Sequence, residues 1–498
     1  MQTVGHVKDK VKTQFPDMVV YKDPSKNKFF SSLGIPSYLR DWLLKRFSDE
    51  EGRINIDEVQ SYVRKVIPRK EEWEAIKAEM VHSGKSVRIL AKIRVEIDIK
   101  TGEGLFRLPD FGFPSRRYEA IINRKVLDEQ KEALLTSPET WGVVELEWQW
   151  KRIEGRPGQG VVSMQDFRPF RPYKVDLDFY QGIRTEFELD EWMDVLLMAV
   201  DYNPDGFINQ KQKVTLLSRL LPFLEKRLNV VELAPKGTGK SYLFSQISKY
   251  GWLVSGGSVT RARLFYDISQ KTTGILGRHD FVALDEIQSI SFPDENEMRG
   301  ALKGYLESGE FRVGDYRGIA EAGIVLLGNI NEHLMDVDRN MFQELPNAFQ
   351  ESALLDRFHG FIKGWDIPRM REDMKACGWA INSEYFSEIT HALRNDIRYR
   401  ALVDDVLTVP KGADTRDTEA IKRLTTAFLK LLFPHAVIGN GITKEEIMES
   451  CLKPAVQMRS TIRRQLHIMD KEYSLDLPEV AVEGIKGQKE NLSPPDHL

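Results

Sequence analysis

The sequence predicts an α/β protein built on a parallel sheet, with helical and β-rich regions around it. Between residues 229 and 330, short apolar strands alternate with helical segments, an order typical of a parallel sheet with crossover helices. One of these strands leads into a glycine-rich turn at 234–241, and another ends in the acid pair Asp285 and Glu286. Polar residues at strand ends are expected where such sheets place their ligands.

Composition indicates a protein of several domains without a disulfide or zinc framework. A chain of 498 residues is too long for one core. Its two cysteines, Cys377 and Cys451, form no CxxC motif, which suits a reducing cytoplasm. The N-terminus lacks a secretory apolar segment and no apolar run is long enough to span a membrane, so we expect a cytoplasmic protein. With a net charge of −4, nucleic-acid binding would depend on local basic patches.

Changes in periodicity divide the chain into five regions. Apolar residues at helical spacing dominate both ends of the chain, whereas strict alternation at 91–100 and 142–151 predicts half-buried strands. The last residues have too little apolar content to pack. The predicted regions are a helical N-terminal region at 1–83, a β-rich module at 84–175, an α/β core at 176–367, a helical region at 368–475 and a disordered tail at 476–498.

The turn APKGTGKS at 234–241 is typical of a phosphate loop (Walker A), because it follows an apolar strand and precedes a helix. Glycines let the backbone curl around phosphates, Lys240 supplies a cation, and the Ser241 hydroxyl can ligate Mg²⁺. Ala234 stands where the usual pattern has glycine. The alternative is a glycine-rich turn with a surface lysine. The predicted ATP-binding residues are Pro235, Lys236, Gly237, Thr238, Gly239, Lys240 and Ser241.

The strand FVALDE ends in two carboxylates that suit metal-assisted hydrolysis (Walker B). Asp285 is expected to hold Mg²⁺ and Glu286 to polarise the attacking water. The alternative is a strand that ends in two solvated acids. Because the acid pair follows the phosphate loop in the expected order, the sequence predicts a site for ATP and Mg²⁺.

Two further polar residues are candidates for the hydrolytic site. The apolar strand AGIVLLGNIN ends at Asn329, which can orient a water beside the γ-phosphate, although it could equally be a turn residue. Arg357, in LLDRFH, can reach the γ-phosphate of a neighbouring subunit, and its alternative is a surface ion pair with Asp356. An arginine acting on a neighbour requires a ring or filament.

The motifs APKGTGKS, VALDE, LLGNIN and LLDRFH, in this order, resemble the AAA+ core of the Lon-related BrxL family of BREX phage-defence systems. The similarity extends to about Ser474, and the core also resembles minichromosome-maintenance helicases. This resemblance implies an AAA+ P-loop ATPase with a helical lid, in which Asn329 is sensor 1 and Arg357 the arginine finger. In the lid, DTRDTEAIKRL is similar to the helicase segment that supplies a second sensor arginine, here Arg416.

The resemblance also implies DNA contacts. The stretch YLESGEFRVGDYRGIAEAGIV corresponds to the hairpin that the helicases point into their channel, so Arg312 and Arg317 are candidate backbone contacts, with a solvated hairpin as the alternative. The β-rich module resembles an oligonucleotide-binding (OB) fold. Its candidate stacking and phosphate-binding residues are Trp148, Trp150, Phe167, Arg168, Phe170 and Arg171, although alternating tryptophans are more often core.

Taken together, the motifs and the resemblance imply a cytoplasmic ATPase that forms a hexamer or stacked hexamers around DNA and acts with other BREX proteins. Relatives carry a C-terminal Lon-like protease domain, but the segment after the last predicted helix is too short for one, so protease activity is not expected. An ATP-dependent unfoldase or protease-type subunit acting on polypeptide and a nucleotide-gated DNA-binding scaffold remain alternatives. The hairpin residues Arg312, Asp315, Tyr316 and Arg317 favour DNA modestly over peptide.

Overall fold

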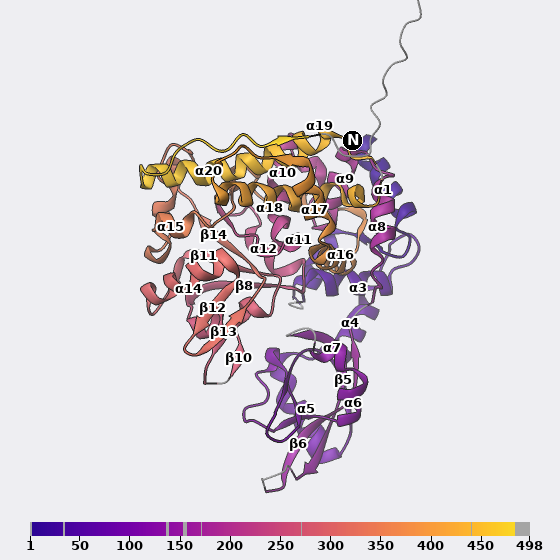
Figure 1. Ribbon diagram of the computed structural model, residues 1–498. Coiled ribbons are helices and arrows are strands. Elements are labelled where there is room, and N and C mark those ends of the chain that lie inside the picture. The colour runs from indigo at the N-terminus through magenta and orange to yellow at the C-terminus, as the bar shows by residue number, and fades with distance from the viewer. Residues whose placement is uncertain are drawn as a thin grey trace, which may run out of the picture. The chain divides into compact units, whose positions relative to one another are not determined.

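The chain forms two compact units, one comprising residues 1–45 and 175–498 and the other residues 46–174. Each unit has its own hydrophobic core, as expected for a chain of this length. The computed structural model in Figure 1 describes residues 2–32, 35–135, 139–152, 157–170, 172–269, 271–439 and 441–483.

The first unit is built on a five-stranded sheet in which every neighbouring pair of strands is parallel, as the sequence predicts. The central strands are buried on both faces, which explains their continuous apolar sequences. Because the strands are parallel, their carboxyl ends meet at one edge of the sheet. In sheet order the strands are β15 (Gly360–Lys363), β7 (Val230–Ala234), β14 (Gly323–Asn329), β11 (Phe281–Ser291) and β8 (Gly251–Ser258).

Helices follow most strands of this unit, and the chain from residue 383 to residue 469 is largely helical. The long helices α18 and α20 pack against each other (Figure 1). Helix α20 also packs on the edge strand β15. The helices are α1 (Gln2–Gln14), α2 (Pro24–Ser32), α3 (Ser37–Phe47), α8 (Leu177–Arg184), α9 (Leu189–Ala199), α10 (Gln210–Leu217), α11 (Leu221–Leu224), α12 (Lys240–Gln246), α13 (Arg261–Leu264), α14 (Glu295–Ser308), α15 (Ser352–Leu355), α16 (Ser383–Asn395), α17 (Arg398–Val406), α18 (Thr415–Leu432), α19 (Lys444–Glu446) and α20 (Lys453–Met469).

Two small antiparallel ribbons lie side by side in the first unit. They are β9 (Tyr266–Asp267) with β10 (Thr272–Thr273), and β12 (Glu310–Val313) with β13 (Tyr316–Ile319). The rings of Tyr266 and Tyr316 stack between the ribbons, with centroids 3.6 Å apart. The sequence predicts only the second ribbon, because two-residue strands give no detectable alternation.

The structure divides the predicted N-terminal helical region, 1–83, between the two units, and the division falls inside α3. Ahead of it, strand β1 (Val19–Lys22) pairs antiparallel with β16 (Gly378–Ile381), so the start of the chain packs on the first unit. The sequence does not predict β1, because four residues are too few to show a period. Beyond α3, helices α4 (Ile56–Val66) and α5 (Trp73–Ser83) belong to the second unit.

The strands of the second unit, which fall within the β-rich module predicted at 84–175, form a closed barrel. Its strands follow the order β2, β3, β4, β6, β5, and all pairs are antiparallel except β4 with β6. Alternate residues such as Ile93, Val144 and Met164 fill the interior. The strands are β2 (Val87–Ile97), β3 (Gly104–Arg107), β4 (Ala120–Ile122), β5 (Thr140–Lys151) and β6 (Gln159–Pro169).

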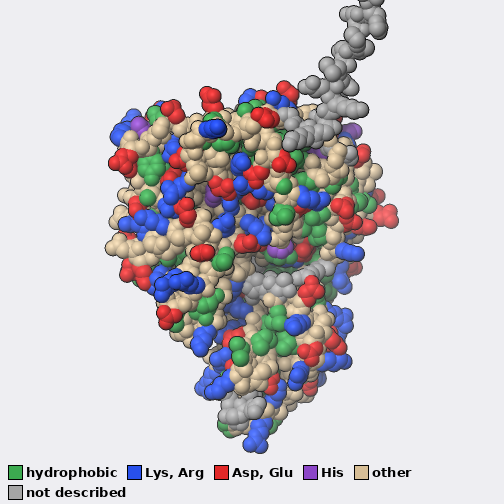
Figure 2. Space-filling view, viewed as in Figure 1, with side chains coloured by type: hydrophobic (Ala, Val, Ile, Leu, Met, Phe, Trp, Pro, Cys, Tyr) green, Lys and Arg blue, Asp and Glu red, His purple; other side chains and the backbone are tan. Residues whose placement is uncertain are grey.

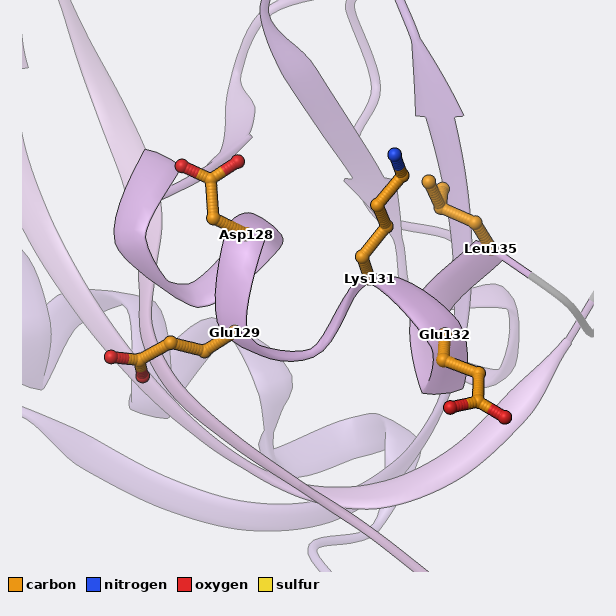
Figure 3. A pocket seen from close by; sticks show the side chains of 5 residues that line it. All are labelled: Asp128, Glu129, Lys131, Glu132 and Leu135. Atoms are coloured by element: carbon orange, nitrogen blue, oxygen red, sulfur yellow. The ribbon is translucent and has the colours of Figure 1, made fainter.

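Two short helices of the barrel unit, α6 (Arg124–Glu129) and α7 (Lys131–Leu135), flank a surface depression. Its lining side chains, shown in Figure 3, are Asp128, Glu129, Lys131, Glu132 and Leu135. Three of these five side chains are acidic, so the depression repels phosphate groups and is no candidate for a nucleotide site.

Part of the predicted tail, 476–498, is ordered. Strand β18 (Ala481–Val482) pairs antiparallel with β17 (Leu407–Thr408), so the prediction of disorder is wrong for these residues. Backbone pairing with a strand distant in sequence supplies the hydrogen bonds that the weakly apolar segment could not indicate. Residues 484–498 lie outside the described residues.

Candidate nucleotide-binding site

The predicted phosphate loop lies between the end of β7 at Ala234 and the start of α12 at Lys240. Gly237 and Gly239 have φ angles of +84° and +76°, in the left-handed region that favours glycine. At Gly239 there is also no space for a side chain, because a Cβ would lie 2.2 Å from the Tyr202 hydroxyl. Position 239 therefore requires glycine both for its backbone conformation and for lack of space.

Lys240 is buried beside the loop, with 8% of its surface exposed. Its Nζ donates to the carbonyl oxygens of Ala234 and Pro235 at 3.3 and 3.2 Å and to Oδ1 of Asn329 at 3.4 Å. Burial lowers the pKa of Lys240, and the carboxylates of Glu232 and Asp285 partly oppose this effect. The three acceptors are neutral, so the positive charge of the ammonium group is not cancelled by a direct partner.

The acid pair lies in β11, at the point where its pairing with β8 becomes irregular after Asp285. Asp285 is buried, and one of its carboxylate oxygens accepts a hydrogen bond of 2.9 Å from the backbone N–H of Glu286. Glu286 is exposed and has a φ angle of +50°, an uncommon conformation for a residue with a side chain. Such backbone strain is frequent at functional sites.

Asn329 is the last residue of β14, where it pairs in register with Ala234 at the end of β7. Because β14 lies between β7 and β11, the structure brings the phosphate loop, the acid pair and Asn329 to the same edge of the sheet. Gln288 fixes the backbone of Asn329 from the β11 side. Its side-chain amide donates to the Asn329 carbonyl at 2.6 Å and accepts from the Asn329 N–H at 3.3 Å.

Sequence reasoning missed an ion pair that supports the loop from within the core. Arg219, in the turn η4 (Ser218–Leu220), forms two hydrogen bonds with Glu232 of β7, at 3.0 and 2.6 Å, and both side chains are fully buried. The same guanidinium donates to the carbonyl of Thr238 at 2.8 Å. An acid inside the apolar strand NVVELA was the available signal, because a buried carboxylate needs a partner.

The helix that follows the loop is held by a second buried group of charges. The Tyr242 hydroxyl donates to Asp201 at 2.6 Å, and Asp201 also pairs with Arg40 at 2.7 Å and Lys22 at 2.8 Å. Burial would raise the pKa of Asp201, but Arg40 and Lys22 outweigh burial and hold it well below its ordinary value. Ser37 and Arg40 also contact the Tyr242 hydroxyl, at 2.8 and 3.3 Å, so the N-terminal segment touches helix α12 directly, which no local sequence pattern indicates.

The residues at this edge fit a magnesium–triphosphate group. Among the described residues, Lys240 has no carboxylate within ion-pair distance, so its charge is available for phosphate oxygens. The Ser241 hydroxyl and the Asp285 carboxylate are oxygen ligands of the kind that Mg²⁺ prefers.

The predicted arginine finger, Arg357, and the predicted second sensor arginine, Arg416, share one acidic partner. Arg357 pairs with Glu307 at 2.7 Å, and not with Asp356 as the alternative in the sequence analysis assumed. Arg416 donates to the same Glu307 oxygen at 3.2 Å and to Asp356 at 3.1 Å. None of the contacts described for these arginines involves the phosphate loop or the acid pair.

The predicted hairpin is formed by β12 and β13, and its two basic residues are direct cross-strand neighbours. Arg312 pairs with Arg317 in the register, and both are exposed. Arg312 donates to the carbonyl of Gly314 at 2.9 Å. On the face seen in Figure 2, Lys and Arg side chains are interspersed with Asp and Glu, so DNA binding would depend on local pairs such as this one.

The barrel candidates separate into buried and exposed residues. Phe167 and Phe170 are core residues, 0% and 8% exposed, so their assignment to base stacking is wrong. Trp148 is partly buried against the core, whereas Trp150 is 69% exposed. The difference arises because β4 pairs with β6 only as far as Val162, which lies opposite Trp148. Beyond Trp148, β5 and β6 continue as a two-stranded ribbon.

Of the basic candidates in the barrel, Arg168 is exposed and forms an ion pair of 3.3 Å with Asp166 on the same strand. Such a pair is solvated and leaves the guanidinium accessible to another anion. Arg171 lies outside the described residues.

Comparison with known proteins assigns both halves of the chain. Residues 162–478 match the ATPase-domain model of the Lon-like protease BrxL-like family, and residues 13–148 match the N-terminal model of the BREX system Lon protease-like protein BrxL. The chain is similar to the Lon-like protease BrxL of Escherichia coli O9:H4 (strain HS), with 28% identity over 458 residues, 91% of this chain and 63% of the relative.

A second relative is the Lon-like protease BrxL of Bacillus cereus (strain H3081.97), with 30% identity over 467 residues, 92% of this chain and 66% of the relative. The chain thus spans 63% and 66% of the length of these two curated relatives. Within the described ranges, no helix combines the length and apolar character needed to cross a membrane.

Proposed function

Because this chain belongs to the BrxL family of BREX systems, we propose that it is an AAA+ ATPase that forms a ring on DNA. ATP hydrolysis would drive DNA engagement or translocation in the cytoplasm, as part of anti-phage defence with other BREX proteins. The observation that carries the proposal is the convergence of Lys240, Asp285 and Asn329 at one edge of the parallel sheet. The match to an ATPase-domain model supports it independently.

In this proposal each residue at the sheet edge has one role. Lys240 and the loop residues bind the phosphates, and Ser241 and Asp285 hold Mg²⁺, which when bound neutralises charge on the β- and γ-phosphates. Glu286 is the general base that holds the attacking water, because it is exposed beside the buried Asp285. Asn329 orients that water while its own backbone is fixed by Gln288.

The arrangement of the arginines supports a ring. Arg357 and Arg416 share contacts with Glu307 and not with their own phosphate loop, so they suit a γ-phosphate bound by the neighbouring subunit. A six-membered ring, single or stacked, would place one arginine pair at each interface.

DNA is the proposed substrate because of the barrel and the hairpin. A five-stranded barrel with one parallel pair of strands supports assignment to the OB fold, a common nucleic-acid-binding architecture. Its exposed Trp150 and Arg168 offer a stacking surface and a cation, and Arg312 and Arg317 on the hairpin offer two more cations.

The proposal is tested by measuring phosphate release with duplex DNA, with single-stranded DNA and with an unfolded polypeptide. Stimulation by DNA and rings threaded by DNA in electron micrographs are the expected results. Stimulation by the polypeptide alone would favour an unfoldase. ATP binding without turnover in any of these conditions would favour a nucleotide-gated scaffold.

A further inference from the structure

One carboxylate oxygen in the first unit contacts both the predicted arginine finger, Arg357, and the predicted second sensor arginine, Arg416. Oε2 of Glu307 lies 2.7 Å from Nε of Arg357 and 3.2 Å from Nη2 of Arg416. We infer that Glu307 is a positioning residue, which orients both arginines toward a neighbour's γ-phosphate and links them to the β12–β13 hairpin. This inference rests on the proposed function, because it assumes that the arginines act across a subunit interface.

The contacts of Arg357 leave one end of its guanidinium available. Glu307 contacts Nε, and Nη1 donates to the backbone carbonyl of Ala353. Among the contacts described for Arg357, none involves the third nitrogen, Nη2, so Nη2 can bind an incoming anion while Nε keeps its ion pair with Glu307. Only 16% of the Arg357 side chain is exposed, so it is held in one orientation before any neighbour arrives.

Behind the arginine pair, the backbone is fixed by buried charges. Arg459, fully buried, donates to the backbone carbonyls of Asp356 and Phe358 at 2.9 and 2.7 Å and to the Asp356 carboxylate at 2.7 Å. The other oxygen of Asp356 accepts from Arg416. The backbone on both sides of Arg357 is thus anchored, so Glu307 is the exchangeable part of the network. Its side chain is 49% exposed, which permits a phosphate group to compete with it.

The position of Glu307 in α14 links the arginines to the hairpin. Helix α14 ends one residue later, at Ser308, and β12 begins at Glu310. Between them, Gly309 has a φ angle of +80° and accepts a hydrogen bond of 3.0 Å from the N–H of Ala320, just after β13. A side chain on Gly309 would also clash with the carbonyl oxygen of Ala320, which lies 2.8 Å from the position of a Cβ.

The root of the hairpin is also fixed to the body of α14. The buried Tyr305 hydroxyl donates to the Ala322 carbonyl at 2.7 Å, which ties the helix to the chain that leads into β14. Because both ends of the hairpin are fixed to the last turns of α14, movement of the hairpin on DNA shifts Glu307. A shift of Glu307 changes the orientation of Arg357 and Arg416, which couples DNA contact to hydrolysis at the interface.

The test compares Glu307→Gln with the parent in steady-state ATP hydrolysis, with and without duplex DNA. The amide keeps the size of the side chain but loses its charge, so kcat should fall about tenfold while the KM for ATP changes less than about twofold. Stimulation by DNA should disappear. A merely structural role would instead lower the thermal unfolding midpoint and raise the KM together with any loss of kcat.

Two variants serve as controls. Glu310→Gln removes an exposed charge three residues away on the same segment and should retain the parent kcat and DNA stimulation. Glu307→Asp restores a carboxylate at a shorter reach and should recover part of the lost kcat. In a double-mutant cycle, Glu307→Gln combined with Arg357→Ala should lower kcat no further than Arg357→Ala alone, because the two residues act as one unit.

The inference about Glu307 would be overturned if Glu307→Gln kept the kcat and the DNA stimulation of the parent. It would also be overturned if the losses of kcat from Glu307→Gln and Arg357→Ala were additive in the double variant. Failure of the proposed function has a different signature. In that case Arg357→Ala itself would leave hydrolysis unchanged, or the parent would show no hydrolysis in the presence of DNA.

Discussion

The Nζ atom of Lys240 lies 3.4 Å from Oδ1 of Asn329, although the two residues are 89 positions apart in the chain. Parallel pairing of β14 with β7 causes this proximity, because it places Asn329 beside Ala234 at the start of the phosphate loop. An amide oxygen satisfies the ammonium group without neutralising it. The lysine therefore keeps its charge for phosphate, and Asn329 is placed to respond when phosphate takes over that hydrogen bond.

Replacing Lys240 with alanine is expected to weaken ATP binding and to lower hydrolysis by about a hundredfold or more, because the only buried cation of the loop is lost. Binding can be followed with a fluorescent ATP analogue and hydrolysis by phosphate release. The control is Lys453→Ala, which removes an exposed lysine of α20. Equal losses in both variants would contradict a specific role for Lys240.

Glu286→Gln should bind ATP as the parent does but hydrolyse it about a hundredfold more slowly, since the amide cannot act as a base. Binding and single-turnover hydrolysis measured on the same sample separate the two effects. Glu295→Gln, an exposed change at the start of α14, is the control. Near-parent turnover in Glu286→Gln would assign the base to another residue.

Arg219→Met should destabilise the first unit by about 3–5 kcal/mol, because it leaves the buried carboxylate of Glu232 without a partner. The double change Arg219→Met with Glu232→Leu should recover most of that stability, since no buried charge remains. ATP affinity should stay reduced, because the hydrogen bond to Thr238 is still absent. Denaturant unfolding measures stability, and nucleotide titration measures ATP affinity. Full recovery of affinity in the double variant would show that the hydrogen bond from Arg219 to Thr238 does not support the loop.

The double variant Arg312→Ala, Arg317→Ala should bind duplex DNA more weakly. The plot of the logarithm of the association constant against the logarithm of salt concentration should become less steep, its negative slope shrinking in magnitude by about two. Fluorescence anisotropy at several salt concentrations gives this slope. Arg371→Ala removes an equally exposed arginine that is paired with Asp373, and should leave the slope unchanged. An unchanged slope in the hairpin variant would show that DNA binds to a part of the protein other than the hairpin.

The stability of the first unit should fall as pH is lowered from about 6.5 toward 4. Burial, assisted by the Arg184 cation, lowers the pKa of His435 from 6.5 to about 4. In this window the unfolded chain takes up a proton that the folded state does not, so stability decreases by roughly 1.4 kcal/mol at about pH 5.5. Urea unfolding at about pH 7.5 and 5.5 measures the loss. The variant His435→Gln should lose less stability than the parent between these two pH values. A loss equal to that of the parent would assign the pH dependence to other groups.

The sequence by itself determined the strands of the sheet and the residues at their ends. Apolar runs that stop at Ala234, Asp285 and Asn329 indicate buried strands with polar ends, and parallel strands must present those ends at one edge. The left-handed glycines of the loop could likewise be predicted, because only glycine adopts that conformation freely.

Only the tertiary structure decided which side chains contact one another across long separations. Three features depend on the packing of elements distant in the chain: the pair of Arg219 with Glu232, the contact of Glu307 with both Arg357 and Arg416, and the burial of Phe167. Local periodicity shows that a residue faces a core or solvent, but it does not show which charge lies opposite. The partner of each buried or bridging charge is therefore fixed by the fold, through the cost of leaving that charge unpaired.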